Sequence, residues 1–383
     1  MLATVDRLAG AEFAGRRVGT AGGRAAAAWL ADQLREIGAA VTVDEFRVAG
    51  AVRELYETPV LHWANDLGTW RLVHRRDFCE HLASADAPEP RTGRLALSGE
   101  ADLRGAWLLD SELSIERARE AAVAGALGLL VPQGTDEAGW MPKMIAGPAS
   151  VAMPVLAVRA DLHRQIEAFA MGGTGAVTAS VPLRTVDVTA ANLLGVIRDI
   201  RPHRLSVLLT AHFDGVGDDP EMRFPAAADN ASGVAVVLEA ARQLRTSLDP
   251  RVGLAVALLD AEEAGAHGSA HHAVQVPPGT FVINVDGAAE LGEAAAVEAG
   301  GPADPLLAAL DRAGRQVGVP LRAGAVPSDN RRYAAAGLPA VGIGMGLPGY
   351  QTPAETPDRV QPATLLAAVR LVVATVHHLT ARN

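Results

Sequence analysis

Histidine, aspartate and glutamate side chains recur at four places in the second half of the chain, each close behind an apolar run. These residues are His212 and Asp214, Asp229, Glu262 and Glu263, and Asp286. Imidazole and carboxylate ligands suit zinc, manganese or cobalt. Of two adjacent carboxylates, one can bind the metal while the other acts as a general base on metal-bound water. Each group alone has a plainer explanation, because Asp is a common helix N-cap and acidic turns are common. Their repetition favours a metal site.

The composition of the 383 residues narrows the chemistry further. One cysteine, Cys79, excludes an intrachain disulfide and Cys-cluster metal sites, and one lysine, Lys143, leaves a single candidate for amine catalysis. The net charge of −10 argues against nucleic-acid binding. The sequence has no G-x-S-x-G motif, so it gives no support for a serine hydrolase. Residues 344–349 match GxGxxG, but Pro348 is incompatible with the helix start that pyrophosphate binding needs. Any catalytic metal must therefore be held by His, Asp and Glu.

The N-terminus has no basic segment followed by an apolar run, and no apolar stretch reads as long and uncharged enough to span a membrane. We therefore expect no membrane association and a cytoplasmic location, or secretion if a leader has been removed. The sequence leaves the oligomeric state open, with a homodimer as one option.

From about residue 190 the chain has the pattern of strands that alternate with helices. The predicted buried strands are Leu205–Leu209, Val252–Leu259, Phe281–Val285 and Ala340–Ile343, and the predicted helices are 233–244, 305–318 and 362–379. Near the N-terminus, 24–37 is periodic like a helix and 41–48 alternates like a strand. This order predicts an α/β fold, with a mostly parallel central sheet flanked by helices. The acidic groups and His212 would then meet at the carboxyl edge of the sheet, where ligands usually bind.

The segment between these parts has a different residue pattern. Residues 49–189 contain many short strand-like runs, such as 94–97 and 106–109, that are divided by glycine and proline. Such a segment is typical of a β-rich module. We therefore expect a discontinuous α/β domain, 1–48 and 190–383, with a β-rich domain inserted at 49–189.

The motifs resemble those of the co-catalytic zinc aminopeptidases, the family of bacterial leucyl-aminopeptidase-like enzymes within the glutamate carboxypeptidase and transferrin-receptor superfamily. The motifs are His212-x-Asp214, Asp229-Asn230-x-Ser232-Gly233, Glu262-Glu263-x-Gly265 and Asn284-x-Asp286, supported by Gly15-Arg16, Gly19-Thr20, Ser328-Asp329 before Gly337-Leu338-Pro339-Ala340, and Tyr350-Gln351-Thr352. The resemblance covers 1–48 and 190–383, and the insert resembles a protease-associated domain, with matches at 124–126 and 153–155.

The resemblance implies two metal positions and a set of roles. His212 and Asp286 would hold the first zinc, Glu263 the second, and Asp229 would bridge them. The remaining roles are those of Glu262 as general base, Asp214 as the residue that orients His212, and Tyr350 as an oxyanion donor. The family often has a cis peptide after the bridging aspartate, here Asp229–Asn230.

One departure concerns the second position. The family usually has His-Thr where this chain has Gln351-Thr352, and the aspartate of a following Asp-Thr pair is here Glu355. A glutamine carbonyl is a weaker zinc donor than imidazole. We therefore expect one tightly bound zinc and a second that is weak or absent, with Gln351 as the remaining ligand; His267 is a less favoured substitute.

The sequence thus predicts a zinc-type metallopeptidase that hydrolyses peptide or small amide bonds, with an aminopeptidase as the first choice. Two alternatives stay open. One is a repurposed single-metal enzyme that carries out amide or acyl transfer, or cyclisation, on a specialised small molecule. The other is a non-catalytic binding protein on the same scaffold.

Overall fold

The computed structural model describes residues 1–201 and 204–381. The chain divides into two compact units. Unit 1 comprises Met1–Val48, Val188–Asp218 and Arg223–Asn383, and unit 2 comprises Ala49–Asp187 and Asp219–Met222. The predicted insert of 49–189 omits residues 219–222, which pack with unit 2 although they lie far along the chain.

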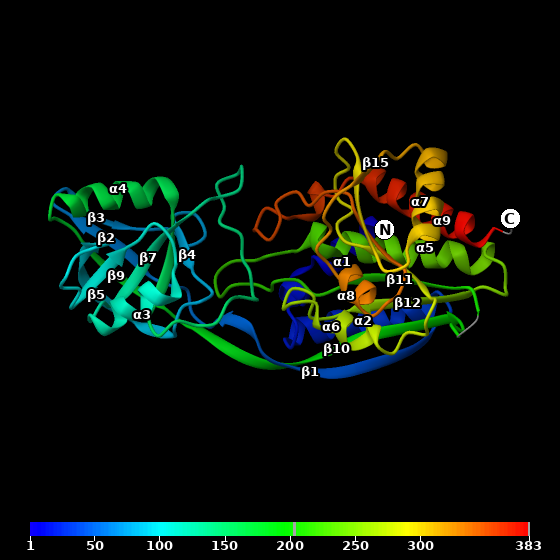
Figure 1. The fold of residues 1–383 in the computed structure, drawn as a ribbon, viewed down its shortest axis with the longest axis horizontal. Helices are drawn as coiled ribbons and strands as arrows, with labels where there is room; N and C mark the ends of the chain where they lie inside the picture. Colours follow the sequence, from blue (N-terminus) through cyan, green and yellow to red (C-terminus); the bar gives the residue numbers. More distant parts are fainter. Residues whose placement is uncertain (202–203, 382–383) are drawn as a thin grey trace. The chain divides into compact units, whose positions relative to one another are not determined.

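An eight-stranded sheet forms the centre of unit 1 (Figure 1). In spatial order its strands are β1 (Ala40–Leu55), β10 (Leu183–Arg198), β12 (Gly253–Leu259), β11 (Ser206–His212), β13 (Phe281–Val285), β16 (Ala340–Gly344), β14 (Ala295–Gly300) and β15 (Leu321–Ala323). The four central strands β12, β11, β13 and β16 are parallel, whereas β10 pairs with β12 and β14 pairs with β16 in the antiparallel sense. The predicted α/β class is confirmed.

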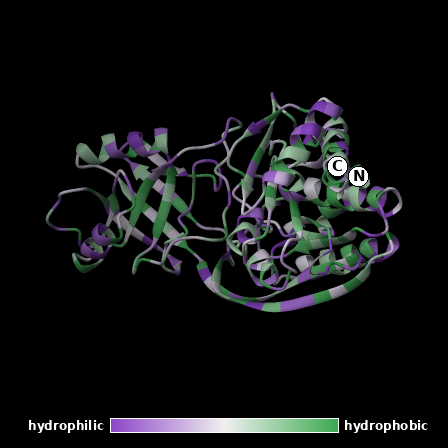
Figure 2. Cartoon of the chain, turned by 45° about the vertical axis from the view of Figure 1, so that its right-hand side comes forward, coloured by the Kyte–Doolittle hydropathy of each residue, from purple (hydrophilic) through white to green (hydrophobic). Residues whose placement is uncertain are grey.

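Helices cover both faces of this sheet because the central strands are apolar on both sides. Val207 and Leu209 face a core that contains residues of α1, α2, α5, α7 and α9, whereas Leu208 faces a smaller core with residues of α6 and α8. The helices of unit 1 are α1 (Leu2–Leu8), α2 (Ala21–Glu36), α5 (Gly233–Ser247), α6 (His267–Ala273), α7 (Asp304–Val317), α8 (Asn330–Ala335) and α9 (Pro362–Thr380), with helical turns at Ala11–Arg16, Ala227–Ser232 and Pro357–Arg359. Figure 2 shows the central strands mainly in the hydrophobic colour.

The parallel register fixes where the chemical groups emerge. His212 ends β11 opposite Leu259, the last residue of β12, and Thr210 lies opposite Asn284 near the end of β13. The chain segments that carry Asp214, Glu262, Glu263 and Asp286 therefore leave the sheet at the same edge.

Helix α9 requires a correction to the sequence prediction. Among the described residues, Pro362–Thr380 is the one helix that is long and apolar enough to cross a membrane by length and composition, so the expectation that no such stretch exists is wrong on that measure. Half of the apolar stretch of α9 is buried inside the protein, and α9 packs against α5 and α7. These contacts are those of a core helix.

Unit 2 has its own sheet and its own cores. The strand order is β3 (Gly68–Arg71), β2 (Leu61–Asn65), β9 (Ala176–Val181), β5 (Ala87–Leu97), β6 (Ala106–Leu109), β7 (Gly128–Gln133), β8 (Val155–Arg159) and β4 (Phe78–Glu80). One face packs on residues of α4 (Ala160–Met171) and the other on residues of α3 (Ile115–Val123). The sequence indicated the β-rich character of this unit but not its helix α4.

Candidate metal centre

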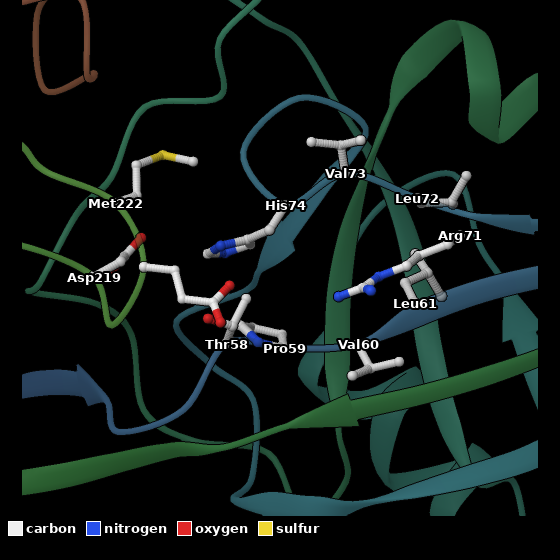
Figure 3. A pocket seen from close by; sticks show the side chains of 11 residues that line it. Thr58, Pro59, Val60, Leu61, Arg71, Leu72, Val73, His74, Asp219 and Met222 are labelled. Carbon is white, nitrogen blue, oxygen red and sulfur yellow. The ribbon is translucent and has the colours of Figure 1, made fainter.

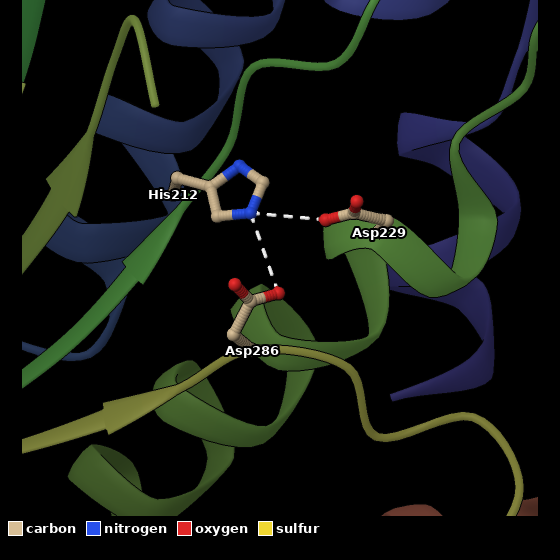
Figure 4. A group of neighbouring side chains, drawn as sticks. All are labelled: His212, Asp229 and Asp286. Carbon is tan, nitrogen blue, oxygen red and sulfur yellow. Dashed lines mark ion pairs between the residues drawn. The ribbon is translucent and has the colours of Figure 1, made fainter. Parts of the chain in front are cut away.

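Three ligand atoms converge at the carboxyl edge of the unit 1 sheet (Figure 4). His212 Nε2 lies 3.0 Å from Asp229 Oδ1 and 3.5 Å from Asp286 Oδ1, and the three atoms lie within 4.8 Å of one another. All three atoms are buried and none makes a hydrogen bond. A bound cation would satisfy these buried polar atoms, which are costly to leave unpaired. These residues fit a zinc ion in ligand type and in spacing.

The charge of this group points the same way. Burial alone would lower the pKa of His212, but the carboxylates of Asp286 and Glu262 raise it well above its usual value. In the absence of a metal, the carboxylates therefore favour a proton on the imidazole. A bound dication would take over that balancing role.

Asp214 ties His212 to the two glutamates that follow β12. Its backbone carbonyl lies 3.2 Å from His212 Nδ1, and its carboxylate Oδ1 lies 3.6 Å from the same nitrogen. The carboxylate also accepts hydrogen bonds from the backbone N–H of Glu262 (3.0 Å) and of Glu263 (3.2 Å). Asp214 therefore holds the imidazole and the Glu262–Glu263 turn in one arrangement.

Both glutamates have a raised pKa. Burial is the main cause for Glu262, and its pKa rises well above the usual value although His212 acts in the opposite direction. Burial and the charges of Asp229 and Glu262 raise the pKa of Glu263. A buried carboxylate with a raised pKa accepts a proton more readily than an exposed one, as a general base must.

The Asp229-Asn230-x-Ser232 motif joins the helical turn at 227–232 to the end of β13. The Asp229–Asn230 peptide is cis, as the resemblance implies. Asn230 Nδ2 donates to the carbonyl of Val285, and its Oδ1 accepts from the N–H of Gly287. Ser232 Oγ accepts from the N–H of Ala288. These bonds fix Asp229 relative to the segment that carries Asp286.

Gln351 lies beside Glu263, in a loop after β16. Its Nε2 donates to Glu263 Oε2 at 2.6 Å, while Gln351 Oε1 and Glu263 Oε1 are buried without hydrogen bonds. The second metal position therefore contains an amide–carboxylate hydrogen bond. His267 begins α6 and is not part of the three-atom group described above.

Tyr350 precedes Gln351 at the rim of the site, where it is 41% exposed. Burial and the charges of Asp229 and Glu263 raise its pKa above the usual value, so its hydroxyl stays protonated. It can therefore donate a hydrogen bond, as the oxyanion role requires, and that role remains a prediction.

Two buried residues support the site without having been assigned a role from the sequence. Glu355 accepts from the N–H of Asp229 (2.6 Å) and of Gln351 (2.7 Å), and burial raises its pKa to about 8. Asp329 is fully buried; burial, partly opposed by His212, raises its pKa to about 7, and its charge raises the pKa of Glu262. The signals were the Glu355-Thr356 and Ser328-Asp329 pairs, which marked the resemblance but not their contacts.

Comparison with known proteins agrees with the resemblance predicted from the sequence. Residues 192–376 match the family described as "Peptidase family M28". A curated relative, described as "Probable lipoprotein aminopeptidase LpqL" of Mycobacterium tuberculosis, is 32% identical over 154 residues, which is 40% of this chain and 28% of that protein. The match thus spans about a quarter of that relative.

Solved structures of two bacterial aminopeptidases share the fold. The zinc aminopeptidase BSAP of Bacillus subtilis is 21% identical, with a TM-score of 0.74 over 100% of this chain and 94% of that one. The aminopeptidase of Aneurinibacillus sp. strain AM-1 is 20% identical, with a TM-score of 0.70 over 98% and 92% of the two chains. The predicted resemblance is confirmed: residues 192–376, which contain every predicted site residue, match peptidase family M28, and the α/β fold is that of the zinc aminopeptidases.

Proposed function

We propose that the protein is a zinc-dependent hydrolase of peptide or small amide bonds, and that it acts as an aminopeptidase. The observation that carries this proposal is the convergence of His212, Asp229 and Asp286, whose buried ligand atoms face one another without hydrogen bonds. The M28 match and the aminopeptidase fold support it. The names of the similar proteins suggest peptides as the substrate class.

Each residue then has a defined task. A zinc ion held by His212, Asp229 and Asp286 would polarise a water and the substrate carbonyl. Glu262 takes the proton from the attacking water and returns it to the leaving amine nitrogen as the C–N bond breaks. Asp214 holds the backbone of Glu262 through the 3.0 Å hydrogen bond. The protonated hydroxyl of Tyr350 is available to stabilise the negative charge that develops on the carbonyl oxygen.

We further propose that one zinc binds tightly. Glu263, the ligand that would belong to the second position alone, is engaged by Gln351 Nε2 at 2.6 Å. A second cation would have to break this bond and accept a neutral amide oxygen in place of imidazole. Its affinity should be correspondingly low.

The variant Glu262→Gln tests the assignment of the general base. The substitution removes the proton acceptor but adds no bulk, so we expect the rate with a panel of aminoacyl p-nitroanilides to fall about 10²- to 10⁴-fold. Zinc content should stay unchanged, and Glu293→Gln, at an exposed glutamate, is the control. Full, chelator-sensitive activity in Glu262→Gln would show that the role is assigned wrongly.

Gln351 also favours a second candidate, a single-metal enzyme that performs amide or acyl transfer, or cyclisation, on a specialised small molecule. The same substrate panel separates the two. Turnover of aminoacyl substrates supports the aminopeptidase and removes the non-catalytic alternative as well. No turnover by a protein that holds one equivalent of zinc would favour the second candidate.

A further inference from the structure

The segment between two of the candidate ligands leaves unit 1 and returns to it. His212 ends β11 and Asp229 lies in the turn at 227–232, and between them residues 219–222 belong to unit 2. The excursion therefore joins the two ligands through a turn that belongs to unit 2.

The two ends of the excursion are held within unit 1 by Arg16. Its guanidinium is fully buried and donates to the carbonyls of Phe213 (2.8 Å), Pro225 (3.0 Å) and Ala226 (2.8 Å). The backbone N–H of Gly217 and of Asp218 donate to residues of the 11–16 turn as well. Both ends of the loop are thus hydrogen-bonded to unit 1 near the two ligands.

The tip of the excursion is held within unit 2 by ion pairs. Asp219 and Met222 form a tight turn with reciprocal backbone hydrogen bonds. Asp219 Oδ2 lies 2.9 Å from Arg75 Nε, and Asp219 Oδ1 lies 2.9 Å from Lys143 Nζ, the amine of the single lysine of the chain. Arg75 also pairs with Glu80, which in turn contacts His74.

All members of this network are buried. The side chains of Arg75, Lys143, Glu80 and Asp219 are each less than one-tenth exposed. Two carboxylates and two cations balance each other, so the network is neutral when His74 is neutral. Removal of one buried partner leaves an uncompensated charge, which makes the turn costly to release.

We propose that Asp219 is a positioning residue for the metal centre: its ion pairs with Arg75 and Lys143 fix the turn 219–222 and so restrain the loop that joins His212 to Asp229. The proposal rests on the proposed function, since it assigns a metal-binding role to those two ligands.

The same turn also borders a cavity of about 320 Å³ within unit 2, shown in Figure 3. Met222 and Asp219 line it on one side, and His74 and Arg71 line it on another. The ion pairs of Asp219 hold the turn beside this cavity.

The test compares two variants of the same network. Asp219→Ala and Glu80→Ala each remove one buried carboxylate that pairs with Arg75, but only the first lies on the turn. For each variant we would measure the zinc dissociation constant by competition with a chromogenic chelator. Amide hydrogen exchange of residues 213–228 in the metal-free protein provides the second readout.

For Asp219→Ala we expect about tenfold weaker zinc binding, the effect typical of removing a residue that orients metal ligands, together with faster exchange across 213–228. Glu80→Ala should change zinc affinity less than twofold and leave this exchange unchanged. Equal effects in the two variants, or none in Asp219→Ala, would overturn the proposal. If Asp219→Ala does not fold, Lys143→Gln, which removes one ion pair, is compared with Glu80→Ala by the same criteria.

Failure of the proposed function looks different. If the unmodified protein binds no zinc, the metal assignment fails, yet exchange of residues 213–228 still reports whether Asp219 holds the loop. If zinc binds normally and Asp219→Ala has no effect, only the positioning role is lost.

Discussion

Negative charge is concentrated around a single imidazole. The carboxylates of Asp286, Glu262, Asp214 and Asp229 each raise the pKa of His212. The nearby cation, Arg16, has its pKa lowered to about 10 because it is fully buried. One imidazolium and one guanidinium do not balance four carboxylates, and a bound dication would improve that balance.

Gln351→His is the residue change that addresses metal stoichiometry. Imidazole at this position would restore the usual ligand and remove the amide that donates to Glu263. We expect elemental analysis to give one zinc per chain in the unmodified protein and close to two in the variant at equal free zinc. Two tightly held ions in the unmodified protein would show that the second position is not weakened.

Arg16→Met tests a residue whose importance was visible only in the structure. The substitution keeps an unbranched stem but removes every donor, leaving buried carbonyls of Leu8, Phe213 and Ala226 without their partner. We expect the free energy of unfolding to fall by about 3 kcal/mol or more. Urea denaturation checks this, with Arg24→Met, an exposed arginine that makes one bond to a backbone carbonyl, as control. A loss no larger than in the control would contradict the prediction.

For individual residues, the sequence indicated which residue types form the candidate site but not which contacts hold them in place. His212, Asp229 and Asp286 could be predicted because ligand chemistry restricts the residue type and parallel strands bring their ends together. Arg16 and Glu355 could not, because their partners are backbone groups contributed by distant segments. Those partners have no signature in the sequence.

Among the elements, apolar strands were predicted more accurately than short helices. The prediction for β13 at 281–285 agrees with the structure, and β12 begins one residue later than predicted, because continuous apolar runs fix a buried strand. Strand β1 is longer than predicted, reaching Leu55, and β14 and β15 were missed. Strands β1 and β15 are the edges of the sheet and β14 lies next to β15. These strands contain small and polar residues, and their pairing depends on neighbours rather than on their own pattern.

The packing of α6 on α8 gives a prediction about pH. His272 Nδ1 lies 2.8 Å from the hydroxyl of Tyr333, and burial lowers the pKa of His272 to about 4. A histidine in the unfolded chain has a pKa near 6.5. Between that pH and about 4, His272 is therefore protonated in the unfolded chain but neutral in the folded protein. The contribution of His272 to the free energy of unfolding should therefore be largest above about pH 6.5 and fall as pH decreases toward 4, by up to about 3 kcal/mol.

The variant His272→Gln isolates this contribution. Glutamine can still accept the hydrogen bond of Tyr333 but does not titrate. Urea denaturation at several pH values between 7 and 4.5 should show the stability difference between variant and unmodified protein shifting in favour of the variant as pH falls. A difference that does not change with pH would show that His272 does not contribute to the acid sensitivity.

Over the whole molecule, each unit has a sheet with its own apolar cores. Four of the five tryptophans, Trp63, Trp70, Trp107 and Trp140, belong to unit 2, whereas most of the helices belong to unit 1. Tryptophan fluorescence therefore reports mainly on unit 2, and far-ultraviolet circular dichroism mainly on unit 1.

We expect these two signals to give thermal transitions that do not coincide. Zinc binds only the folded site, so it should raise the midpoint of the circular dichroism transition more than that of the fluorescence transition. A differential scan with and without chelator supplies the comparison. Coincident transitions that zinc shifts equally would instead indicate one cooperative unit.

The sequence predicted a β-rich segment at 49–189 because the composition changes there, and unit 2 of the structure comprises Ala49–Asp187 and Asp219–Met222. It could not predict that residues 219–222 join this segment, since four residues carry no pattern of their own. Only the buried ion pairs of Asp219 with Arg75 and Lys143 show that residues 219–222 belong to unit 2.

The shared turn has a consequence for protein engineering and for the history of the chain. The backbone N–H of Gly50 donates to Asp187 Oδ1 at 2.9 Å, so the ends of the main insert lie close together and look suited to excision as a cassette. Such a deletion would strand Asp219–Met222 without Arg75 and Lys143. A minimal catalytic unit therefore needs two cuts, with a redesigned connection between Asp218 and Arg223, and any natural gain or loss of the insert required a matching change at this second place.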